Sequence, residues 1–271
     1  MIYFSSMKIH ASTLSSWSDC PRRAAARLLC DEIKEEGYTL RPRQQSIGAI
    51  VGSGAHDAAG LILSERAQGR AVSTSAATEV AVESFRRQCD GEIMWDSTTP
   101  TRTAGEKQVA QQTRIFSESA AASIEPVGVE IRRSAQINNF TITGRYDVEL
   151  VDGAIEDHKF GSGNWPAAGQ LGGYSLLKKS ANGASATALR INYVARVPVG
   201  KSHPGLVQTT YSVEACEREA WATIQRITAG VLAWRAAKTP LVFACNLQSV
   251  LCSPKYCSAH GTEWCELSKG K

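Results

Sequence analysis

The chain has 271 residues, of which 43% are hydrophobic and 21% are charged. This composition is typical of a folded globular protein and argues against a disordered one, and the length allows a sizeable core. The formal net charge of +4 permits a polyanionic partner without requiring one. The longest apolar stretch, 47–63, is interrupted by Ser, His and Asp, and the amino terminus lacks a basic start followed by an apolar core. We therefore expect no membrane-spanning or secretory segment, and a cytoplasmic location.

Helical signals dominate the first 125 residues. Capping residues followed by Ala, Arg and Leu, or by apolar residues at helical spacing, predict helices over 13–32, 44–67, 78–90 and 105–122. From residue 126 onward, alternating and β-branched residues predict strands over 127–133, 137–143, 145–150, 154–160, 186–196 and 206–213. Two further helices are predicted over 166–180 and 214–238.

This order of elements predicts an α/β fold with a central mixed β-sheet flanked by helices. No linker divides the chain, so we expect a single domain over 1–271. Within it we expect a helical amino-terminal region (about 1–125), an α/β core (about 126–240) and a Cys-rich carboxy-terminal segment (about 241–271).

The two strands on either side of residues 151–153 carry the most informative side chains. A three-residue hairpin loop with glycine last, in the left-handed position, is a common connection. With that loop Asp147 lies opposite Asp157, and Lys159 falls on the same face. A two-residue loop would instead place Asp147 opposite His158 and split the group across the sheet.

Paired carboxylates beside a lysine suggest phosphodiester chemistry. Two adjacent carboxylates repel each other, so a cation between them is expected, and a hard divalent ion is the simplest choice. Lys159 would position the attacking water or stabilise charge on a scissile phosphate. The alternative is a solvated strand pair in which the lysine balances two acids, because charged residues commonly face water.

Two helices add polar candidates. Gly52, His56 and Gly60 recur every four residues, forming a stripe on which no bulky side chain flanks the imidazole. His56 is either a metal ligand or a satisfied interior histidine. Gln170 and Tyr174 lie one turn apart on the helix after the hairpin, so both side chains point the same way. An amide and a phenol there could contact a nucleotide or a metal-bound water.

Three of the eight cysteines, Cys252, Cys257 and Cys265, fall in a carboxy-terminal stretch rich in turn formers. Such a segment has little core of its own and needs a bound metal to become ordered. We expect Cys20, which precedes a proline, to be the fourth ligand, with Cys245, Cys30 and His260 as alternatives. Four thiolates suit zinc or an iron–sulfur cluster.

The remaining cysteines have a simpler interpretation. Cys89, Cys216 and Cys30 fit better as buried small hydrophobic residues, the usual environment of a free cysteine.

Several cations lie close in sequence to these motifs, as phosphate contacts would need to be. They are Arg22, Arg23, Arg27, Arg41, Arg43, Arg132, Arg133, Arg145, Lys178 and Lys179. The alternative for any one of them is ordinary scattered surface charge.

Taken in order, the motifs resemble the RecB-type branch of the PD-(D/E)XK nuclease superfamily. The match comprises His56, Gly144-Arg145-Tyr146-Asp147, Ile155-Glu156-Asp157-His158-Lys159 and Gln170-x-x-x-Tyr174. The cysteine layout is similar to that of iron–sulfur nucleases of the AddB type, the CRISPR-associated Cas-four type and related phage exonucleases. The resemblance spans nearly the whole chain.

The resemblance implies roles for these residues. His56, Asp147 and Asp157 would bind magnesium or manganese, assisted by the backbone carbonyl of His158, and an imidazole ligand favours manganese. Lys159 would be the catalytic lysine, and Gln170 and Tyr174 would complete the family's helical motif. Cys20, Cys252, Cys257 and Cys265 would hold a 4Fe-4S cluster. Their carboxy-terminal spacing is looser than the family's tight pair, so Cys245 is an alternative ligand.

The function implied is a metal-dependent DNA exonuclease acting on single strands or DNA ends in recombination, repair or phage DNA processing. A helicase or recombinase is the expected partner, and ring-forming relatives make a homo-oligomer conceivable. One alternative is a non-catalytic iron–sulfur or zinc DNA-binding subunit of a larger DNA-processing complex. Another is a zinc-ribbon scaffold unrelated to nucleases. The intact set of Asp147, Asp157 and Lys159 favours the nuclease.

Overall fold

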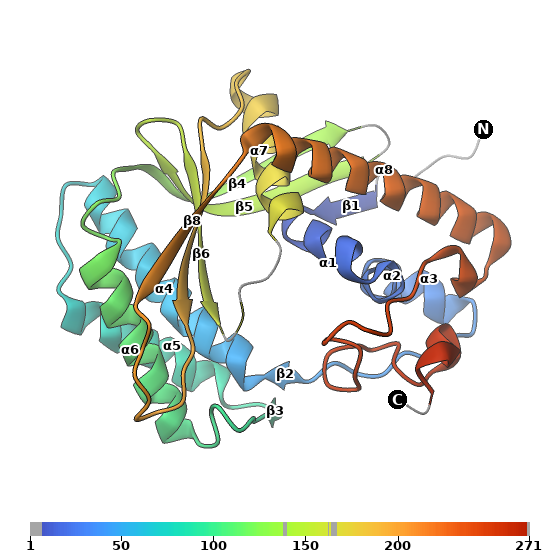
Figure 1. Cartoon of the computed structure of the whole chain (residues 1–271), viewed down its shortest axis with the longest axis horizontal. Helices are drawn as coiled ribbons and strands as arrows, with labels where there is room; N and C mark the ends of the chain where they lie inside the picture. The colour runs from blue at the N-terminus through green and yellow to red at the C-terminus, as the bar shows by residue number, and fades with distance from the viewer. Residues whose placement is uncertain (1–6, 138–139, 162, 164–166, 270–271) are drawn as a thin grey trace.

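The computed structural model describes residues 7–137, 140–161, 163 and 167–269. Its centre is a six-stranded mixed sheet in the order β1-β5-β6-β7-β8, with β4 paired to β5 (Figure 1). The strands are β1 (Met7–His10), β4 (Pro126–Ile137), β5 (Phe140–Leu150), β6 (Ile155–Gly161), β7 (Leu189–Ala195) and β8 (Leu206–Tyr211). The short strands β2 (Gln45–Ser46) and β3 (Ile93–Met94) form a separate parallel pair.

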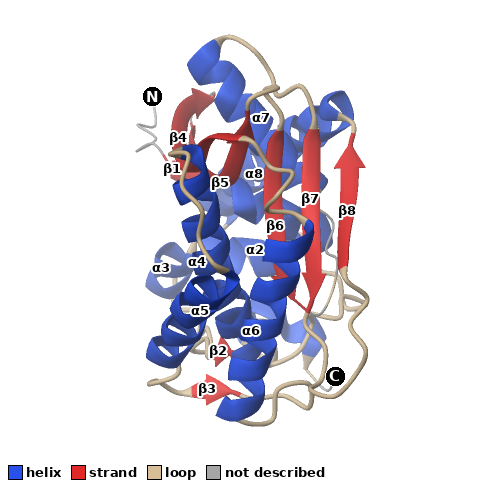
Figure 2. Cartoon of the chain, turned by 90° about the vertical axis from the view of Figure 1, so that its left-hand side faces the viewer, coloured by secondary structure: helices blue, strands red, loops and turns tan. Residues whose placement is uncertain are grey.

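Helices cover both faces of the sheet (Figure 2), which confirms the predicted α/β architecture. One apolar core joins the sheet to α1 (Leu14–Asp19), α2 (Pro21–Leu28), α3 (Cys30–Glu35), α7 (Ala168–Asn182) and α8 (Val213–Ala237). A second core, on the opposite face, contains α4 (Ile47–Ala67), α5 (Thr74–Gln88) and α6 (Arg102–Ser119). The carboxy-terminal segment holds only the 3-10 turns η2 (Pro240–Val242) and η3 (Glu263–Ser268) among its described residues.

The first predicted helix, 13–32, is wrong as a single element. The chain forms α1, α2 and α3 instead, and Cys20 at the first break has an extended backbone, with φ −148° and ψ 97°. Pro21 explains this break, because a proline ring disfavours a helical conformation of the residue before it. The proline itself begins α2, where its missing N–H costs nothing.

Two predicted strand boundaries are also wrong, because β4 and β5 are long and continuous. Residues 137–143 and 145–150 were expected as separate strands, but Gly144 does not interrupt β5. A Cβ at Gly144 would lie 2.7 Å from Cδ1 of Leu177, so glycine here lets α7 approach the strand. Residues 138–139, within the predicted strand 137–143, lie outside the described residues, as does Pro166 at the start of the predicted helix 166–180. The strand β1 was not predicted.

The three-residue loop between β5 and β6 is confirmed. The Leu150 amide donates to the Ala154 carbonyl at 2.9 Å, and Gly153 has a φ of +83°. The strands pair as Val148 with Glu156 and Glu149 with Ile155. Continuing this register by one residue places Asp147 opposite Asp157, as predicted.

One edge of β5 is shared by two strands. β1 pairs with residues 140–143 in parallel, whereas β6 pairs antiparallel with Val148 and Glu149. The opposite edge pairs with β4 along almost its whole length. Among the described residues, positions 144–147 therefore have no strand partner on the shared edge. We call this opening the strand fork.

Helix α4 closes one side of the strand fork. It is the one described helix that is long and apolar enough to cross a membrane by length and composition alone, but 56% of the apolar window is buried. A Cβ at Gly52 would lie 2.6 Å from the carbonyl oxygen of Phe160 in β6. Such close packing on the sheet identifies α4 as a core helix of a soluble α/β fold.

The crossing of α7 and α8 generates a stability prediction. A Cβ at Gly172 would lie 1.9 Å from the Cys216 carbonyl oxygen, which is backbone and cannot rotate away. We expect Gly172→Ala to lower the free energy of unfolding by about 3 kcal/mol or more through overpacking. The matched control is Gly60→Ala in α4, where the nearest atom, Cγ of Glu130, lies 3.9 Å away.

Urea unfolding of both variants measures this difference. Gly60→Ala should be neutral or stabilising by up to about 1 kcal/mol, because alanine is the better helix former. Equal stability of Gly172→Ala and wild type would contradict the close α7–α8 contact.

Candidate active site

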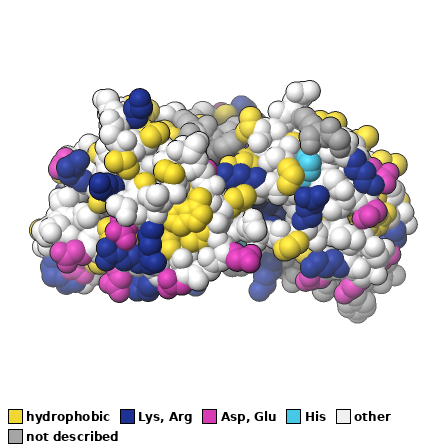
Figure 3. All heavy atoms as spheres, turned by 90° about the horizontal axis from the view of Figure 1, so that it is seen from below, with side chains coloured by type: hydrophobic (Ala, Val, Ile, Leu, Met, Phe, Trp, Pro, Cys, Tyr) yellow, Lys and Arg dark blue, Asp and Glu magenta, His cyan; other side chains and the backbone are white. Residues whose placement is uncertain are grey.

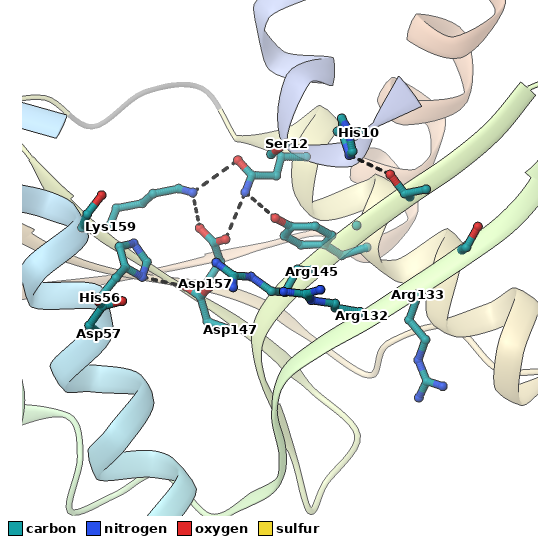
Figure 4. A pocket seen from close by; sticks show the side chains of 16 residues that line it. His10, Ser12, His56, Asp57, Arg132, Arg133, Arg145, Asp147, Asp157 and Lys159 are labelled. Atoms are coloured by element: carbon teal, nitrogen blue, oxygen red, sulfur yellow. Dashed lines mark hydrogen bonds and ion pairs between the residues drawn. The ribbon is translucent and has the colours of Figure 1, made fainter. Parts of the chain in front are cut away.

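A cavity of about 760 Å³ opens at the strand fork (Figure 4). It receives side chains from β1, α4, β4, β5, β6 and α7, so both helical layers contribute to it. Every acid, lysine and helical residue predicted for catalysis lines it: His56, Asp147, Asp157, Lys159, Gln170 and Tyr174. His158 does not line it.

Asp157, Lys159, Gln170 and Tyr174 form one connected polar network. Nζ of Lys159 lies 2.6 Å from Oδ2 of Asp157 and donates to Oε1 of Gln170 at 3.3 Å. Nε2 of Gln170 donates to Oδ1 of Asp157 at 3.0 Å and to the Tyr174 hydroxyl at 2.8 Å. The amide of Gln170 therefore orients the acid, the lysine and the phenol together.

Burial sets the electrostatics of this network. Asp157 is only 1% exposed, and burial raises its pKa, with Asp147 acting in the same direction and Lys159 opposing them. Burial disfavours the ammonium of Lys159, but Asp157 and Asp147 outweigh it and raise the lysine pKa. Burial also raises the pKa of Tyr174, so this residue is a neutral hydrogen-bond partner. Asp157 and Lys159 thus form a buried ion pair that holds charge away from bulk water.

Asp147 is held where the ladder between β5 and β6 ends. Its Oδ2 accepts a hydrogen bond from the backbone amide of His158 at 2.6 Å. Nδ1 of His56 lies 3.8 Å from the same oxygen. The carboxylate therefore takes over the acceptor role that a neighbouring strand would fill, and it brings α4 to the strand fork.

The side chain of His158 faces the opposite layer. It packs 4.7 Å from the ring of Phe116 in α6, and its Nδ1 lies 3.4 Å from Nδ2 of Asn192. Burial, with a contribution from His56, lowers its pKa to about 3. The imidazole is thus neutral and turned away from the cavity, and its backbone carbonyl is the group that the sequence proposed as a ligand.

The donor set suits a hard divalent cation in composition. Oδ2 of Asp157 is fully buried and, despite its short distance to Lys159, has no aligned hydrogen-bond partner among the described residues. Carboxylate oxygens with one imidazole are ligands that magnesium and manganese accept. As the side chains stand, however, no set of three or more His, Cys, Asp or Glu within the described ranges is arranged to hold a metal ion.

Three arginines of β4 and β5, namely Arg132, Arg133 and Arg145, line the cavity, as expected for phosphate contacts. Other cations that the sequence offered for this role are structural. Lys178 is buried, lies 3.1 Å from Glu149 and donates to the Gly153 carbonyl. Both Nε and Nη2 of Arg22 donate to the Phe243 carbonyl.

Sequence reasoning missed the cavity residues contributed by β1 and the turn after it. His10 and Ser12 line the cavity, and Nδ1 of His10 lies 2.7 Å from Oγ1 of Thr143. It also missed Glu130, which has a left-handed φ of 55° and lies 2.7 Å from Nε of Arg145. Burial, and then Asp147, raise the pKa of Glu130. The short β1 carries no distinctive pattern, so nothing in the sequence pointed to these positions.

The carboxy-terminal thiols lie near Cys20, at the break between α1 and α2. Sγ of Cys245 lies 3.6 Å from Sγ of Cys265, and burial together with Cys265 raises the Cys245 pKa to about 12. Burial raises the pKa of Cys257, where Cys20 and Cys265 act in the same direction. Cys20 and Cys265 thus act electrostatically on both Cys245 and Cys257. We call Cys20, Cys245, Cys257 and Cys265 the thiol cluster. The backbone amide of Cys252 donates to Ser249.

This thiol cluster fits a metal in its donor chemistry. Two thiolates on one tetrahedral zinc, with Zn–S bonds of about 2.3 Å, lie about 3.8 Å apart, close to the separation of Cys245 and Cys265. His260 is buried, and neither ring nitrogen has a hydrogen-bond partner in the described part of the chain. Of the cysteines expected to be buried, Cys216 is, but Cys30 and Cys89 are only half-buried.

Comparison with profiles of known protein families finds no match, and comparison with curated proteins finds none. Among solved structures, a protein from Eubacterium rectale named as a presumed exonuclease superposes with a TM-score of 0.57 at 10% identity, covering 91% of this chain and 87% of that one. LHK-Exo in complex with dAMP covers 68% of this chain and 96% of that one, at 12% identity, but its TM-score of 0.30 carries no argument. The first likeness shows that the two chains share a fold.

The buried imidazole of His158 predicts a dependence of stability on pH. Its pKa of about 3 in the folded chain lies below the unfolded value of 6.5, so the unfolded chain binds a proton first as the pH falls. Stability from this group is present above pH ~6.5 and is lost progressively between pH ~6.5 and ~3. We expect His158→Gln to lose less stability than wild type between pH 7 and pH 5.

Urea unfolding at the two pH values measures this, with His203→Gln as the control because His203 lies away from the cavity and in a loop. If the stability of His158→Gln fell as steeply as that of wild type between pH 7 and pH 5, the neutral, buried state of His158 would be contradicted.

Proposed function

We propose that this protein is a divalent-metal-dependent deoxyribonuclease that removes nucleotides from DNA ends. The observation that carries the proposal is the buried Asp157–Lys159 ion pair, oriented by Gln170, in a cavity lined by arginines. The fold shared with a presumed exonuclease supports it independently. A purely structural ion pair would not need to lie at the strand fork beside a second acid and a half-exposed imidazole.

The residues divide the chemistry between them. Asp147 and Asp157, with His56, would hold magnesium or manganese. When bound, the ion would polarise the scissile phosphate and make the attacking water more acidic. Lys159 would stabilise the charge that builds on the phosphate, and Gln170 keeps its ammonium directed at that position. The arginines of β4 and β5 would hold neighbouring phosphates through charge-assisted hydrogen bonds.

The finer parts of the proposal follow from the resemblance and from this chemistry. The substrate is single-stranded DNA or a DNA end, processed in the cytoplasm during recombination, repair or phage DNA metabolism. A helicase or recombinase would supply such ends, and a homo-oligomer is one assembly that would retain them. A basic cavity on a nuclease-like fold supports DNA as the substrate class.

Activity on end-labelled single-stranded DNA with manganese or magnesium tests the proposed site. We expect Asp157→Asn and Lys159→Met to reduce the cleavage rate by at least about a hundredfold, as loss of a group that stabilises transition-state charge does. Lys179→Ala is the matched control, since Lys179 is exposed at the end of α7 and does not line the cavity. It should cleave like wild type.

Chelation by EDTA should abolish cleavage, and added manganese should restore it. Because breaking a buried ion pair can destabilise the fold by several kcal/mol, circular dichroism must first show that both variants are folded. Equal cleavage by wild type and folded variants would overturn the site. DNA binding without cleavage by wild type would favour a non-catalytic DNA-binding subunit.

We further propose that the thiol cluster holds a 4Fe-4S cluster or a zinc ion that joins the two ends of the chain. Iron and zinc analysis of anaerobically prepared protein, with absorbance near ~400 nm, distinguishes the two, because iron–sulfur clusters are coloured and zinc is not. We expect Cys265→Ser to lose the metal and to lower the melting temperature. Cys89→Ser, on α5, should do neither. Wild-type protein free of both metals would overturn this proposal.

A further inference from the structure

A second cavity, of about 590 Å³, lies on the other side of the catalytic lysine. His56 and Lys159 line both this cavity and the one at the strand fork. A third, of about 270 Å³, shares Ser46, Ala49 and Tyr256 with the second. The three cavities are therefore neighbours with shared walls, in a row that runs from the arginines of β4 and β5, past Lys159, to the Cys-rich segment.

The second cavity has a wall suited to a phosphate. It includes Gly48 and Ala49 in the first turn of α4, where helical N–H groups lack intrahelical acceptors and attract anions. The Ala49 amide donates to the hydroxyl of Ser46, which caps the helix. Facing this first turn is Arg196, which is only 6% exposed. Its Nη1 and Nη2 donate to Asp96, whose carboxylate also lines this cavity, and its Nε has no partner in the described part of the chain. A Cβ at Gly48 would lie 3.1 Å from Nη2 of this arginine, so glycine lets the guanidinium reach the helix end.

The opposite wall is suited to a nucleobase. Tyr256 is 37% exposed, and Val250 and Leu251 lie beside it in the lining. Nζ of Lys255 lies 5.1 Å from the centre of the Tyr256 ring. An exposed aromatic ring next to a cation is the arrangement on which bases of single-stranded nucleic acids stack.

Cations continue the path beyond Tyr256. Arg27, Arg43 and Lys255 line the third cavity. Burial, and then Arg43 and Arg23, lower the pKa of Arg27, as expected for a crowded group of positive charges. Figure 3 looks at the molecule from the side of the α4 start and the chain end, and dark-blue Lys and Arg side chains appear in and around the hollow near its middle. A polyanion relieves such crowding.

We propose that the second cavity binds the nucleotide next to the scissile phosphate, with its base stacked on Tyr256 and its phosphate at the start of α4. The proposal rests on the proposed function, because it takes the phosphate beside Lys159 as the one that is cleaved. The Cys-rich carboxy-terminal segment, which carries Tyr256, then forms part of the substrate site in addition to packing on the amino-terminal helices. An apolar peptide is a poorer occupant, since the cavity combines a helix amino terminus with the charged side chains of Lys159, Arg196 and Asp96.

Binding of a fluorescent single-stranded oligonucleotide to the full chain in EDTA tests this without cleavage. We expect Tyr256→Ala to weaken binding about tenfold, within the range for loss of one stacked base, and Tyr256→Phe to bind like wild type. The control is Trp221→Ala. Trp221 is an equally exposed aromatic at 39% on α8, a helix that lines none of the three cavities.

Oligonucleotides with one abasic residue sharpen the test. At one position the missing base should weaken binding by wild type about tenfold but should have no further effect in Tyr256→Ala, because the two changes remove the same contact. Lys255→Ala is a second variant on the same wall and should reduce the salt dependence of binding. The proposal would be overturned if Tyr256→Ala bound the oligonucleotide as tightly as wild type. It would also be overturned if an abasic residue, at every position tested, weakened binding by Tyr256→Ala as much as binding by wild type.

The outcome is separable from that of the proposed function. If Asp157→Asn abolishes cleavage while Tyr256→Ala leaves both binding and KM unchanged, the nuclease remains and the nucleotide site is overturned. A second outcome separates them in the other direction. In that outcome wild type shows no cleavage, while Tyr256→Ala weakens oligonucleotide binding and the abasic residue has no further effect in that variant. The nucleotide site is then supported and the catalytic proposal fails.

Discussion

The shared edge of β5 is the constraint on which the rest of this structure depends. β1 occupies one end of that edge in parallel, and β6 occupies the other end in antiparallel. Because β1 runs parallel to β5 and β6 runs antiparallel to it, neither strand continues the other. The hydrogen-bond ladder along this edge of β5 is therefore interrupted between them. Backbone groups that lose a strand partner must find another acceptor or donor. Here the carboxylate of Asp147 accepts from the amide of His158, so the same interruption that opens the cavity also places an acid in it.

Burying the polar network costs free energy, and the opening at the strand fork makes that cost tolerable. A carboxylate as deeply buried as Asp157 is expensive to remove from water unless it is paired and hydrogen-bonded. Lys159 supplies the charge and Gln170 supplies the hydrogen bond. Both partners line the cavity, and the Lys159 side chain is 33% exposed, so a ligand can reach the ion pair. A fully enclosed pair of the kind formed by Lys178 and Glu149 has no such access.

Direct hydrogen bonds join the amino-terminal helices to the carboxy-terminal segment. Arg22 donates to the Phe243 carbonyl, and the Trp264 indole donates to the Arg22 carbonyl at 3.1 Å. Asp19 accepts from Ser249 and from Arg23. These contacts bring the thiol cluster together and hold the segment that carries Tyr256 against the start of α4. Any ligand bound by the thiols would therefore stiffen a wall of the second cavity.

The sequence by itself determined the order of helices and strands, the three-residue loop ending in Gly153, and hence the register that sets Asp147 opposite Asp157. These features are local: apolar periodicity and turn chemistry act over a few residues. It could also predict that His56 lies on an open stripe, because Gly52 and Gly60 flank it. Only the tertiary structure decided that β1 and β6 pair with the same edge of β5, that Cys245 lies beside Cys265, and that Tyr256 and Lys159 line one cavity. Those contacts join residues from 20 positions apart, as in Cys245 and Cys265, to 133 positions apart, as in Met7 and Phe140. No local pattern encodes which distant surfaces will pack together.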